Sequence, residues 1–422
     1  MTEDHNPLVI KGCRQCGKTY SALHFAKTYY KSVVYLNFFE ERVYREVFKD
    51  TFNIDKIILQ LSALLGDKAK FIPGETCIIL DEIQECPQAR TALKFFKIDG
   101  RFDIIATGSL LGISGYRDTP VSIPVGYETV ITMYPLDFEE FLWANNISEE
   151  YIKDLKRHLL EITPFPESIL TTMHQLMLYY IVVGGMPRVV DYFIRHRLLD
   201  EVLHLQRDIV NGYRDDMVKY CPAPDKSKIR ACFDSIPNQL AKENKKFQFS
   251  KIEKGGRASK FEGSLKWIED AGIIQSCHNL TIPELPLAGN AEESVFKIYM
   301  TDIGLLVSML EEGTQFDILQ GRIYTYKGGI VENLIADYLC KAGKKLYYYR
   351  KDSGLEVDFV IRWENQCTLL ECKSSDGNIK STKTILAHPE KYHVYKAIKL
   401  CHKNIGEVDG ILTAPLFMGA FL

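Results

Sequence analysis

The chain contains, close to its amino terminus, the stretch Gly12-Cys13-Arg14-Gln15-Cys16-Gly17-Lys18-Thr19. Glycines at its first and sixth places let backbone N–H groups close around an anion, because no Cβ stands in the way. The lysine can then reach the outer phosphates of a nucleotide, and the threonine hydroxyl can ligate magnesium. We therefore predict that these eight residues form a phosphate loop that binds a nucleoside triphosphate with Mg²⁺.

The segments around this loop alternate between strand and helix character. Apolar runs typical of buried strands occur at residues 8–10, 32–38, 76–80 and 102–107. Helical patterns lie between them, at residues 20–30, 40–70 and 88–97. This alternation predicts a parallel α/β sheet, whose ligands bind at the carboxyl ends of its strands.

Polar residues follow two of the predicted strands. Asp81 and Glu82 come directly after 76–80, and Thr107 and Ser109 end the next strand. We expect Asp81 to hold magnesium, Glu82 to orient or deprotonate the attacking water, and Thr107 or Ser109 to sense the γ-phosphate. The alternative is that the acids are solvated and that the other two are ordinary turn residues.

Composition describes an ordinary globular protein. The chain has 422 residues, 46% hydrophobic content and a net charge of -3, which suits two to four domains and excludes a general polycation. The first residues do not form a signal peptide, and no run of 18 apolar residues occurs. We therefore expect a cytoplasmic protein without a membrane segment.

The 11 cysteines are scattered, which favours reduced thiols over a disulfide framework. Cys13 and Cys16 form a Cys-x-x-Cys pair inside the phosphate loop. A zinc site would need a second pair at matching spacing, which the sequence lacks. Nothing in the sequence alone supports a redox role for the pair.

The middle of the chain is mainly helical and then locally basic. Helical patterns run from about 136 to 215, and residues 226–280 follow the order of a winged helix-turn-helix. Residues 226–270 hold 11 basic and 6 acidic side chains. Six cations there could grip DNA, unless the segment serves as a lid or protein contact: Lys245, Lys246, Lys251, Lys254, Arg257 and Lys260.

A second set of charged residues lies near the carboxyl terminus. Glu332 falls on a predicted helix, Asp358 in a strand, and Glu371 and Lys373 in the next strand. Glu371 and Lys373 share a face because they are two residues apart. Glu332, Asp358 and Glu371 could hold a divalent metal, and Lys373 could position water or stabilise developing charge. The alternative is a group of charged strand ends without a common site.

These motifs together resemble a known family. Their order is similar to that of AAA+ ATPases, and more closely to prokaryotic ATPases with a C-terminal DUF4143 region, over essentially the whole chain. Besides the loop, the resemblance rests on Leu80-Asp81-Glu82-Ile83-Gln84, Gly108-Ser109-Leu110-Leu111, Tyr134-Pro135-Leu136-x-Phe138-x-Glu140-Phe141, Gly184-Gly185-Met186-Pro187, Ser235-Ile236-Pro237, Gly354-Leu355-Glu356-Val357-Asp358-Phe359 and Glu371-Cys372-Lys373.

The resemblance adds several expectations about residues. It implies that the nucleotide is ATP. It also implies that Pro187 senses the nucleotide, and the alternative is that Pro187 only breaks a helix. The spacing Asp358-x12-Glu371-x-Lys373 resembles the PD-(D/E)xK nuclease superfamily. Relatives often place a basic residue where Tyr127 follows Gly126, so the sequence does not assign an arginine finger. Arg117 and Arg188 are candidates, and the alternative for each is an ordinary surface arginine.

We therefore expect an AAA+ domain at 1–150, a helical lid at 151–225, a winged helix-turn-helix at 226–312 and a DUF4143 domain with a restriction-endonuclease-like α/β fold at 313–422. The leading hypothesis is an ATPase coupled to a DNA-directed, nuclease-like domain. The second is a signalling switch whose last domain is an inactive protein-binding platform, with a second copy or another protein as partner. A helicase or recombination motor ranks last, because no further helicase motif is visible.

Overall fold

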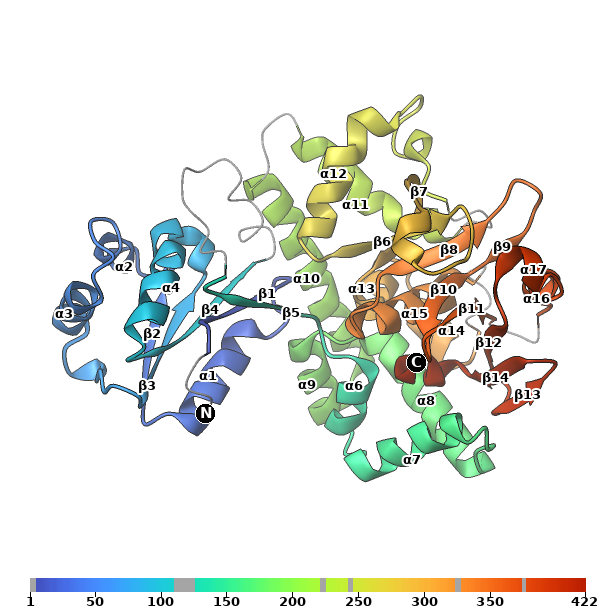
Figure 1. The fold of residues 1–422 in the computed structure, drawn as a ribbon, viewed down its shortest axis with the longest axis horizontal. Helices are drawn as coiled ribbons and strands as arrows, with labels where there is room; N and C mark the ends of the chain where they lie inside the picture. The colour runs from blue at the N-terminus through green and yellow to red at the C-terminus, as the bar shows by residue number, and fades with distance from the viewer. Residues whose placement is uncertain (1–4, 110–125, 221–224, 242–245, 323–327, 374–376) are drawn as a thin grey trace. The chain divides into compact units, whose positions relative to one another are not determined.

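The computed structural model describes residues 5–109, 126–220, 225–241, 246–322, 328–373 and 377–422. Arg117, Lys245, Leu110 and Leu111 from the predicted motifs lie outside these ranges. The chain divides into two compact units, one of Met1–Tyr134 with Asp270–Gly272 and one of Pro135–Glu269 with Ile273–Leu422. Figure 1 shows the elements of both.

The first unit contains a five-stranded sheet in the order β2-β3-β4-β1-β5. All of its strand pairs are parallel, which confirms the predicted parallel α/β sheet. Its strands are β1 (Leu8–Gly12), β2 (Ser32–Asn37), β3 (Thr76–Asp81), β4 (Asp103–Ser109) and β5 (Thr129–Met133). The α-helices that the described residues of this unit form are α1 (Lys18–Tyr29), α2 (Val43–Val47), α3 (Ile54–Leu65) and α4 (Pro87–Asp99). The sequence did not predict β5, an edge strand with mostly exposed side chains and therefore no buried apolar run.

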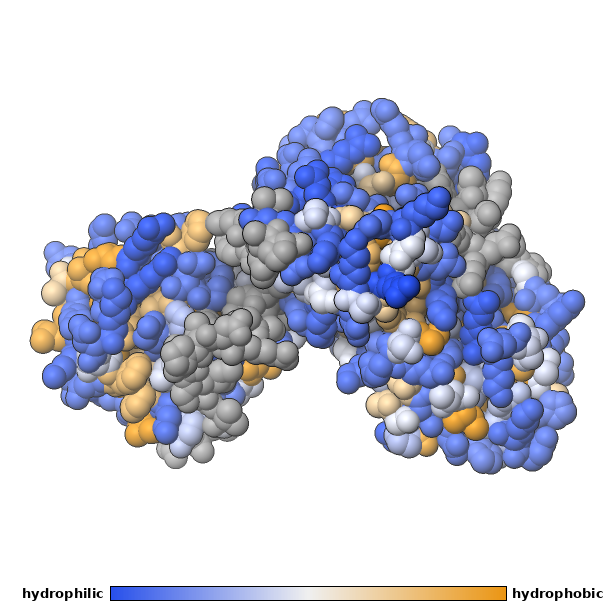
Figure 2. All heavy atoms as spheres, turned by 90° about the horizontal axis from the view of Figure 1, so that it is seen from above, coloured by the Kyte–Doolittle hydropathy of each residue, from blue (hydrophilic) through white to orange (hydrophobic). Residues whose placement is uncertain are grey.

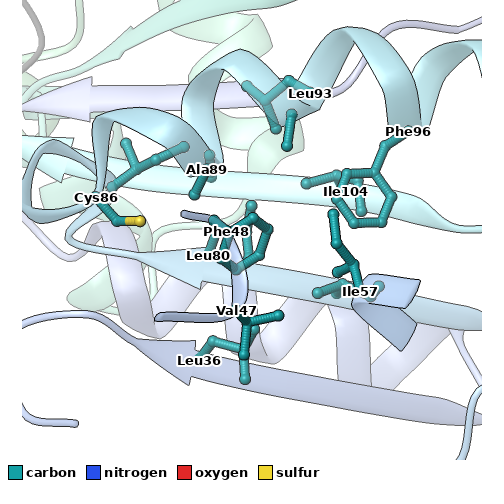
Figure 3. Close-up of a cluster of buried hydrophobic side chains, with 14 of the residues drawn as sticks. Leu36, Val47, Phe48, Ile57, Leu80, Cys86, Ala89, Leu93, Phe96 and Ile104 are labelled. Atoms are coloured by element: carbon teal, nitrogen blue, oxygen red, sulfur yellow. The ribbon is translucent and has the colours of Figure 1, made fainter. Parts of the chain in front are cut away.

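Hydrophobic clusters cover both faces of this sheet. Leu80 of β3 belongs to one cluster, together with Phe48, which follows α2, and Leu93 of α4 (Figure 3). Its neighbour Ile79 belongs to a second cluster, with Ala22 of α1. Adjacent residues enter different clusters because side chains alternate across a strand. Since both faces are covered, the carboxyl ends of the strands are the part of the sheet open to a ligand.

Beyond Tyr134 the chain begins with helices and continues into two further sheets. The helices of this part are α6 (Phe138–Ala144), α7 (Glu149–Leu160), α8 (Glu167–Val183), α9 (Pro187–His196), α10 (Leu199–Tyr220), α11 (Lys226–Leu240), α12 (Ala258–Asp270), α13 (Ile303–Ser308), α14 (Thr314–Leu319), α15 (Gly329–Lys341), α16 (Lys380–Leu386) and α17 (Pro389–Tyr392). The strands are β6 (Ile274–Leu280), β7 (Ala291–Met300), β8 (Leu346–Arg350), β9 (Glu356–Val357), β10 (Phe359–Trp363), β11 (Gln366–Cys372), β12 (Lys396–Cys401), β13 (Gly406–Val408) and β14 (Ile411–Pro415).

The two sheets of this part have mixed directions. One has the order β7-β6-β8-β9, and the other has the order β10-β11-β12-β14-β13. Strand β6 pairs with β7 in antiparallel and with β8 in parallel orientation. The first sheet therefore takes strands from both sides of residue 312, so the segments predicted at 226–312 and 313–422 share a sheet.

The Gly184-Gly185 pair packs backbone against backbone. Leu136 N donates to Gly185 O at 2.7 Å, and Gly185 N donates to Asp302 Oδ2 at 2.7 Å. A Cβ on Gly185 would overlap the Leu136 carbonyl, and one on Gly184, whose φ is 71°, would overlap the Asp302 carboxylate. The motif that contains Pro187 thus brings the start of α6 and the start of α13 together.

A buried group of charges joins α8, α13 and α15. Lys341 Nζ lies 3.0 Å from Asp337 Oδ1 and 3.8 Å from Asp302 Oδ2, and it donates to Tyr180 Oη at 2.8 Å. Burial raises the pKa of Asp337 to about 7. Because buried ions are costly unless they are paired and hydrogen-bonded, this group strongly favours one arrangement of the three helices.

The surface shown in Figure 2 has the hydropathy expected where apolar side chains are buried in the protein's cores. The face in Figure 2 is mainly hydrophilic, with hydrophobic residues in isolated patches. None of the helices in the described ranges combines the length and the apolar character that crossing a bilayer requires.

Replacement of Gly185 tests the backbone packing. We expect Gly185→Ala to lower the free energy of unfolding of the second unit by about 1–3 kcal/mol, as overpacking does. The matched control is Gly212→Ala within α10, where a Cβ meets no atom within 4 Å. There alanine should stabilise by roughly 0.5–1 kcal/mol, because it favours the helix. All three tryptophans (Trp143, Trp267 and Trp363) lie in this unit, so tryptophan fluorescence during urea titration measures it alone. Equal effects of the two variants would contradict the packing argument.

Candidate functional site

The predicted phosphate loop lies between β1 and α1. Gly17 precedes the helix with a φ of 100°, and Gln15 has a φ of 66°. A Cβ on Gly12 would overlap Met133 O of the neighbouring strand and lie 2.8 Å from Cys16 Sγ. The glycines are therefore required by local geometry, and the loop leads into the amino-terminal N–H groups of α1, which favour an anion.

Lys18 is almost completely buried within this loop. Its Nζ donates to Cys13 O at 2.8 Å and to Gly12 O at 3.2 Å, and it lies 3.9 Å from Cys16 Sγ. The ammonium group is thus held on the loop itself, at the place from which it can transfer to a phosphate oxygen.

Asp81 is buried at the end of β3 and accepts hydrogen bonds from four neutral side chains. Thr19 donates to Oδ1 at 2.9 Å, and Thr107 donates to the same oxygen. Tyr35 donates to Oδ2 at 2.7 Å, and Asn37 Nδ2 lies 3.4 Å from it. The structure therefore brings together Thr19, Asp81 and Thr107, three residues that the sequence analysis assigned to one nucleotide site. A hydroxyl beside a carboxylate is a hard-oxygen donor set that fits Mg²⁺.

Tyr35 and Asn37 were missed by the sequence analysis. They stand on β2, and the register places Asn37 beside Asp81. Burial, and then the hydrogen bond to Asp81, raise the pKa of Tyr35, so its hydroxyl stays a donor. Two polar residues near the end of an otherwise apolar strand are the signal that could have identified them.

Glu82 follows Asp81 in a left-handed conformation, with a φ of 54°. Burial is the main cause that raises its pKa, and the charge of Asp81 adds to it. Gln84 Nε2 donates to its carboxylate and holds the side chain in place. Ser109 ends β4 beside Gly12 in the register, so it lies at the same edge of the sheet.

The predicted carboxyl-terminal residues lie in the second unit, where Lys373 joins two of the three acids. Its Nζ lies 2.8 Å from Glu371 Oε2 and 3.0 Å from Asp358 Oδ2. Because Phe359 pairs with Leu370, Asp358 lies across from Glu371. Cys372 N donates to Asp358 at 2.9 Å, and Thr382 donates to Glu371 at 2.6 Å.

The two acids differ in proton affinity. Burial, with the nearby charge of Asp358, raises the pKa of Glu371 to about 7. Burial also opposes ionisation of Asp358, but the charges of Lys373 and Lys297 and the Cys372 N–H outweigh it and lower its pKa. One carboxyl group is therefore held ionised, and the other holds a proton more easily.

Glu332 is paired with residues that the sequence analysis did not single out. Tyr299 donates to its Oε2 at 2.9 Å, and Lys297 Nζ lies 3.6 Å away. Lys297, with a side chain only 1% exposed, also lies 3.0 Å from Glu356. Within the described ranges, no three His, Cys, Asp or Glu residues are grouped closely enough to hold a metal ion. Asp358 and Glu371 supply suitable oxygens, and Glu332 does not complete a three-carboxylate set with them.

The other predicted residues are dispersed over the second unit. Pro187 and Arg188 are the first residues of α9. Exposed cations occur between the short helix Phe249–Lys251 and the first turn of α12, namely Lys251, Lys254, Arg257 and Lys260, and Lys260 pairs with Glu253. Helices α11 and α12 followed by antiparallel β6 and β7 have the order that a winged helix requires, and the winged helix stays a prediction.

Family patterns match three parts of the chain. An AAA domain matches residues 4–142, and a domain of unknown function, DUF4143, matches residues 327–414. Another domain of unknown function, DUF8612, matches residues 174–315. The chain therefore contains an AAA domain and a DUF4143 region. Both parts of the predicted family resemblance are confirmed, and the predicted phosphate loop, residues 12–19, lies within the match to the AAA domain.

Several solved structures are similar at low sequence identity. The Walker-type ATPase PABY2304 of Pyrococcus abyssi is 14% identical, with a TM-score of 0.42 over 72% of this chain and 91% of that chain. The ORC2 protein of Aeropyrum pernix in ADPNP–ADP complexes is 12% identical, with a TM-score of 0.39 over 77% and 90%. AMPPCP-bound DnaA from Aquifex aeolicus is 13% identical, with a TM-score of 0.28 over 63% and 82%. These TM-scores are too low to transfer a domain arrangement or a function. No curated protein matches the chain.

Asp358, Glu371 and Lys373 form what we call the DUF4143 site. The pKa values of its two acids shift in opposite directions, so neutral substitutions of the two acids should change the free energy of unfolding in opposite directions. Glu371 keeps a proton in the folded state up to about pH 7, whereas its ordinary pKa is 4.5. The free energy of unfolding of the wild type therefore falls as the pH rises from 4.5 to about 7. Glu371→Gln should remove this dependence on pH, because glutamine does not titrate. We expect the variant to gain on the order of 1–3 kcal/mol over wild type between pH 5 and pH 8.

Asp358→Asn should act in the opposite direction. Its lowered pKa stabilises the folded state above the ordinary carboxylate range, and this stability is lost as the pH falls through the folded pKa. The asparagine variant should therefore be less stable than wild type at neutral pH. Urea titration with tryptophan fluorescence at both pH values checks the pair, and effects of the same sign would contradict the assignment.

Proposed function

We propose that the protein hydrolyses ATP at the AAA domain and that its nucleotide state controls a metal-dependent, DNA-directed nuclease site in the DUF4143 region. The observation that supports the first part best is the shared contact of Thr19 and Thr107 with Asp81. It joins the phosphate loop to the ends of β3 and β4, where a triphosphate and its metal would lie.

Each residue of the AAA site has a chemical role in this proposal. Thr19 and Asp81 hold Mg²⁺, which neutralises phosphate charge when it is bound. Lys18 moves from the Cys13 carbonyl to the outer phosphates. Glu82 orients the attacking water and accepts its proton, a role that its raised pKa suits. Thr107 and Ser109 sense the γ-phosphate at the end of β4.

Substitutions at Lys18 and Glu82 separate binding from hydrolysis. Lys18→Ala should abolish ATP binding and turnover, because it removes the cation that reaches the phosphates. Glu82→Gln should still bind ATP but hydrolyse it about 10²–10⁴-fold more slowly, the usual contribution of a general base. The control is Lys27→Ala, an exposed lysine on the same helix. Fluorescent nucleotide titration and phosphate release measure both steps, and turnover that survives Lys18→Ala would sink the ATPase assignment.

The nuclease part of the proposal is supported by the contact of Lys373 with both Asp358 and Glu371. The two carboxylates would hold a divalent metal, and the lysine would position the attacking water or stabilise charge on the phosphate. Exposed Lys251, Lys254 and Arg257 in the same unit offer phosphate contacts for DNA.

An assay of DNA cleavage tests the nuclease part of the proposal. The protein is incubated with plasmid or single-stranded DNA in the presence of Mg²⁺ or Mn²⁺, and with ATP, ADP or no nucleotide. Cleavage should depend on the nucleotide, and Asp358→Ala or Lys373→Ala should abolish it while ATP turnover continues. Lys345→Ala, an exposed lysine in the same unit, is the control. DNA that stays intact in every nucleotide state would contradict the nuclease assignment.

A second candidate is a regulatory ATP switch whose DUF4143 region is an inactive platform for a protein partner. This second candidate is favoured by two lysines, which between them contact four acidic side chains. Lys373 contacts Asp358 and Glu371, and the buried Lys297 contacts Glu332 and Glu356. Charges that already neutralise one another attract a metal ion less strongly. Intact DNA together with nucleotide-dependent capture of a second copy or another protein would support this candidate.

A further inference from the structure

The phosphate loop contains two buried cysteines that face each other across a turn. Cys13 and Cys16 are each 4% exposed, and the turn between them is formed by Arg14 and Gln15. Their side chains are joined by a hydrogen bond. Residues at the two ends of such a turn have Cα atoms within about 7 Å, close to the span that a disulfide bridges.

Three features make Cys16 unlike the other buried thiols. The hydrogen bond from Cys13 is the largest cause that lowers its pKa, burial opposes the shift, and Lys18 Nζ at 3.9 Å lowers it further, so that the pKa is about 7. Cys16 also stands just before the amino terminus of α1. Burial alone raises the pKa of Cys232, to about 12. A pairing cysteine, a lysine and a helix amino terminus are the three surroundings that make a thiol nucleophilic.

We propose that Cys13 and Cys16 form a reversible disulfide that closes the phosphate loop and weakens nucleotide binding. The site takes a low-molecular-weight disulfide as oxidant. Cys16 thiolate attacks one sulfur of this oxidant, the oxidant's S–S bond breaks, and one small thiolate leaves. Cys13 sulfur then attacks the Cys16 sulfur, the second small thiolate leaves, and it takes the Cys13 proton. Two protein thiols are oxidised, and one disulfide is reduced to two thiols.

The effect on the nucleotide follows from the shape of the loop. A disulfide holds the two Cβ atoms about 4 Å apart, so the turn between them can no longer spread around a phosphate. The Cys13 carbonyl is also the closest acceptor of Lys18, which must leave it to reach the phosphates. Since coupling between two equilibria is reciprocal, a nucleotide in the loop should shift the dithiol–disulfide equilibrium towards the reduced pair by the same factor that oxidation weakens its binding.

This inference rests on nucleotide binding at the loop, and the experiment separates the two. The full chain is treated with glutathione disulfide or kept in dithiothreitol, and the affinity for a fluorescent, non-hydrolysable ATP analogue is measured. Oxidation should weaken binding by at least about tenfold, within the usual range of coupling between sites. Dithiothreitol should restore it, and peptide mass spectrometry should find the Cys13–Cys16 link.

Variants are judged by the ratio of oxidised to reduced affinity, whatever their starting affinity. Cys16→Ser should have a ratio near one, because it lacks the attacking sulfur. Cys13→Ser should stop at a mixed disulfide of Cys16 with glutathione. The analogue should lower the fraction of linked wild-type protein at equilibrium with glutathione and its disulfide. Absence of the link in wild type, or an unchanged affinity once the link has formed, would overturn the proposal. Failure of the reduced wild type to bind the analogue would instead overturn nucleotide binding itself.

Discussion

The buried carboxylate of Asp81 is the constraint on which the AAA site depends. A charge at that position is tolerated only where donors surround it, and those donors come from α1, β2 and β4. Parallel pairing supplies them, because it brings the carboxyl ends of the strands to one edge. Register in the sheet, closure of the phosphate loop and the position of Thr19 are therefore linked, and a shift of one strand would leave Asp81 without part of its shell.

The second unit meets a similar requirement by different means. Lys341 lies among Asp337, Asp302 and Tyr180, and Gly185 closes against Leu136 without room for a side chain. These contacts join residues that the sequence divides among all four predicted segments: Leu136 (1–150), Tyr180 and Gly185 (151–225), Asp302 (226–312), and Asp337 and Lys341 (313–422). Because separating the helices would expose paired charges and break close backbone packing together, the segments behave as one compact body. Helices α6, α9 and α15, the last of which carries Glu332, therefore belong to the same compact body.

Sequence reasoning is most specific where a role demands one residue type at a fixed spacing. The loop, Asp81 and the pair Glu371 and Lys373 were singled out in this way, and their roles stay predictions. The alternation of strands and helices predicted the parallel sheet, which the structure confirms. Sequence reasoning missed β5, whose exposed residues leave no apolar run. It also missed Tyr35 and Lys297, because each acquires its role only through pairing with a residue distant in sequence, Asp81 or Glu332. Local patterns carry no record of such partners.

The two acidic sites differ in how their charge is balanced, and this difference bears on what each can bind. Asp81 accepts hydrogen bonds from hydroxyl groups and an amide, which stabilise the carboxylate without carrying a positive charge. Asp358 and Glu371 share the ammonium group of Lys373, and Glu332 lies beside that of Lys297. A metal ion entering there must displace Lys373 from one carboxylate, whereas one entering at Asp81 rearranges the neutral donors Thr19, Tyr35, Asn37 and Thr107. Metal affinity at the DUF4143 site should therefore depend on whatever moves Lys373, and a bound phosphodiester, which attracts an ammonium group, is a ligand of that kind.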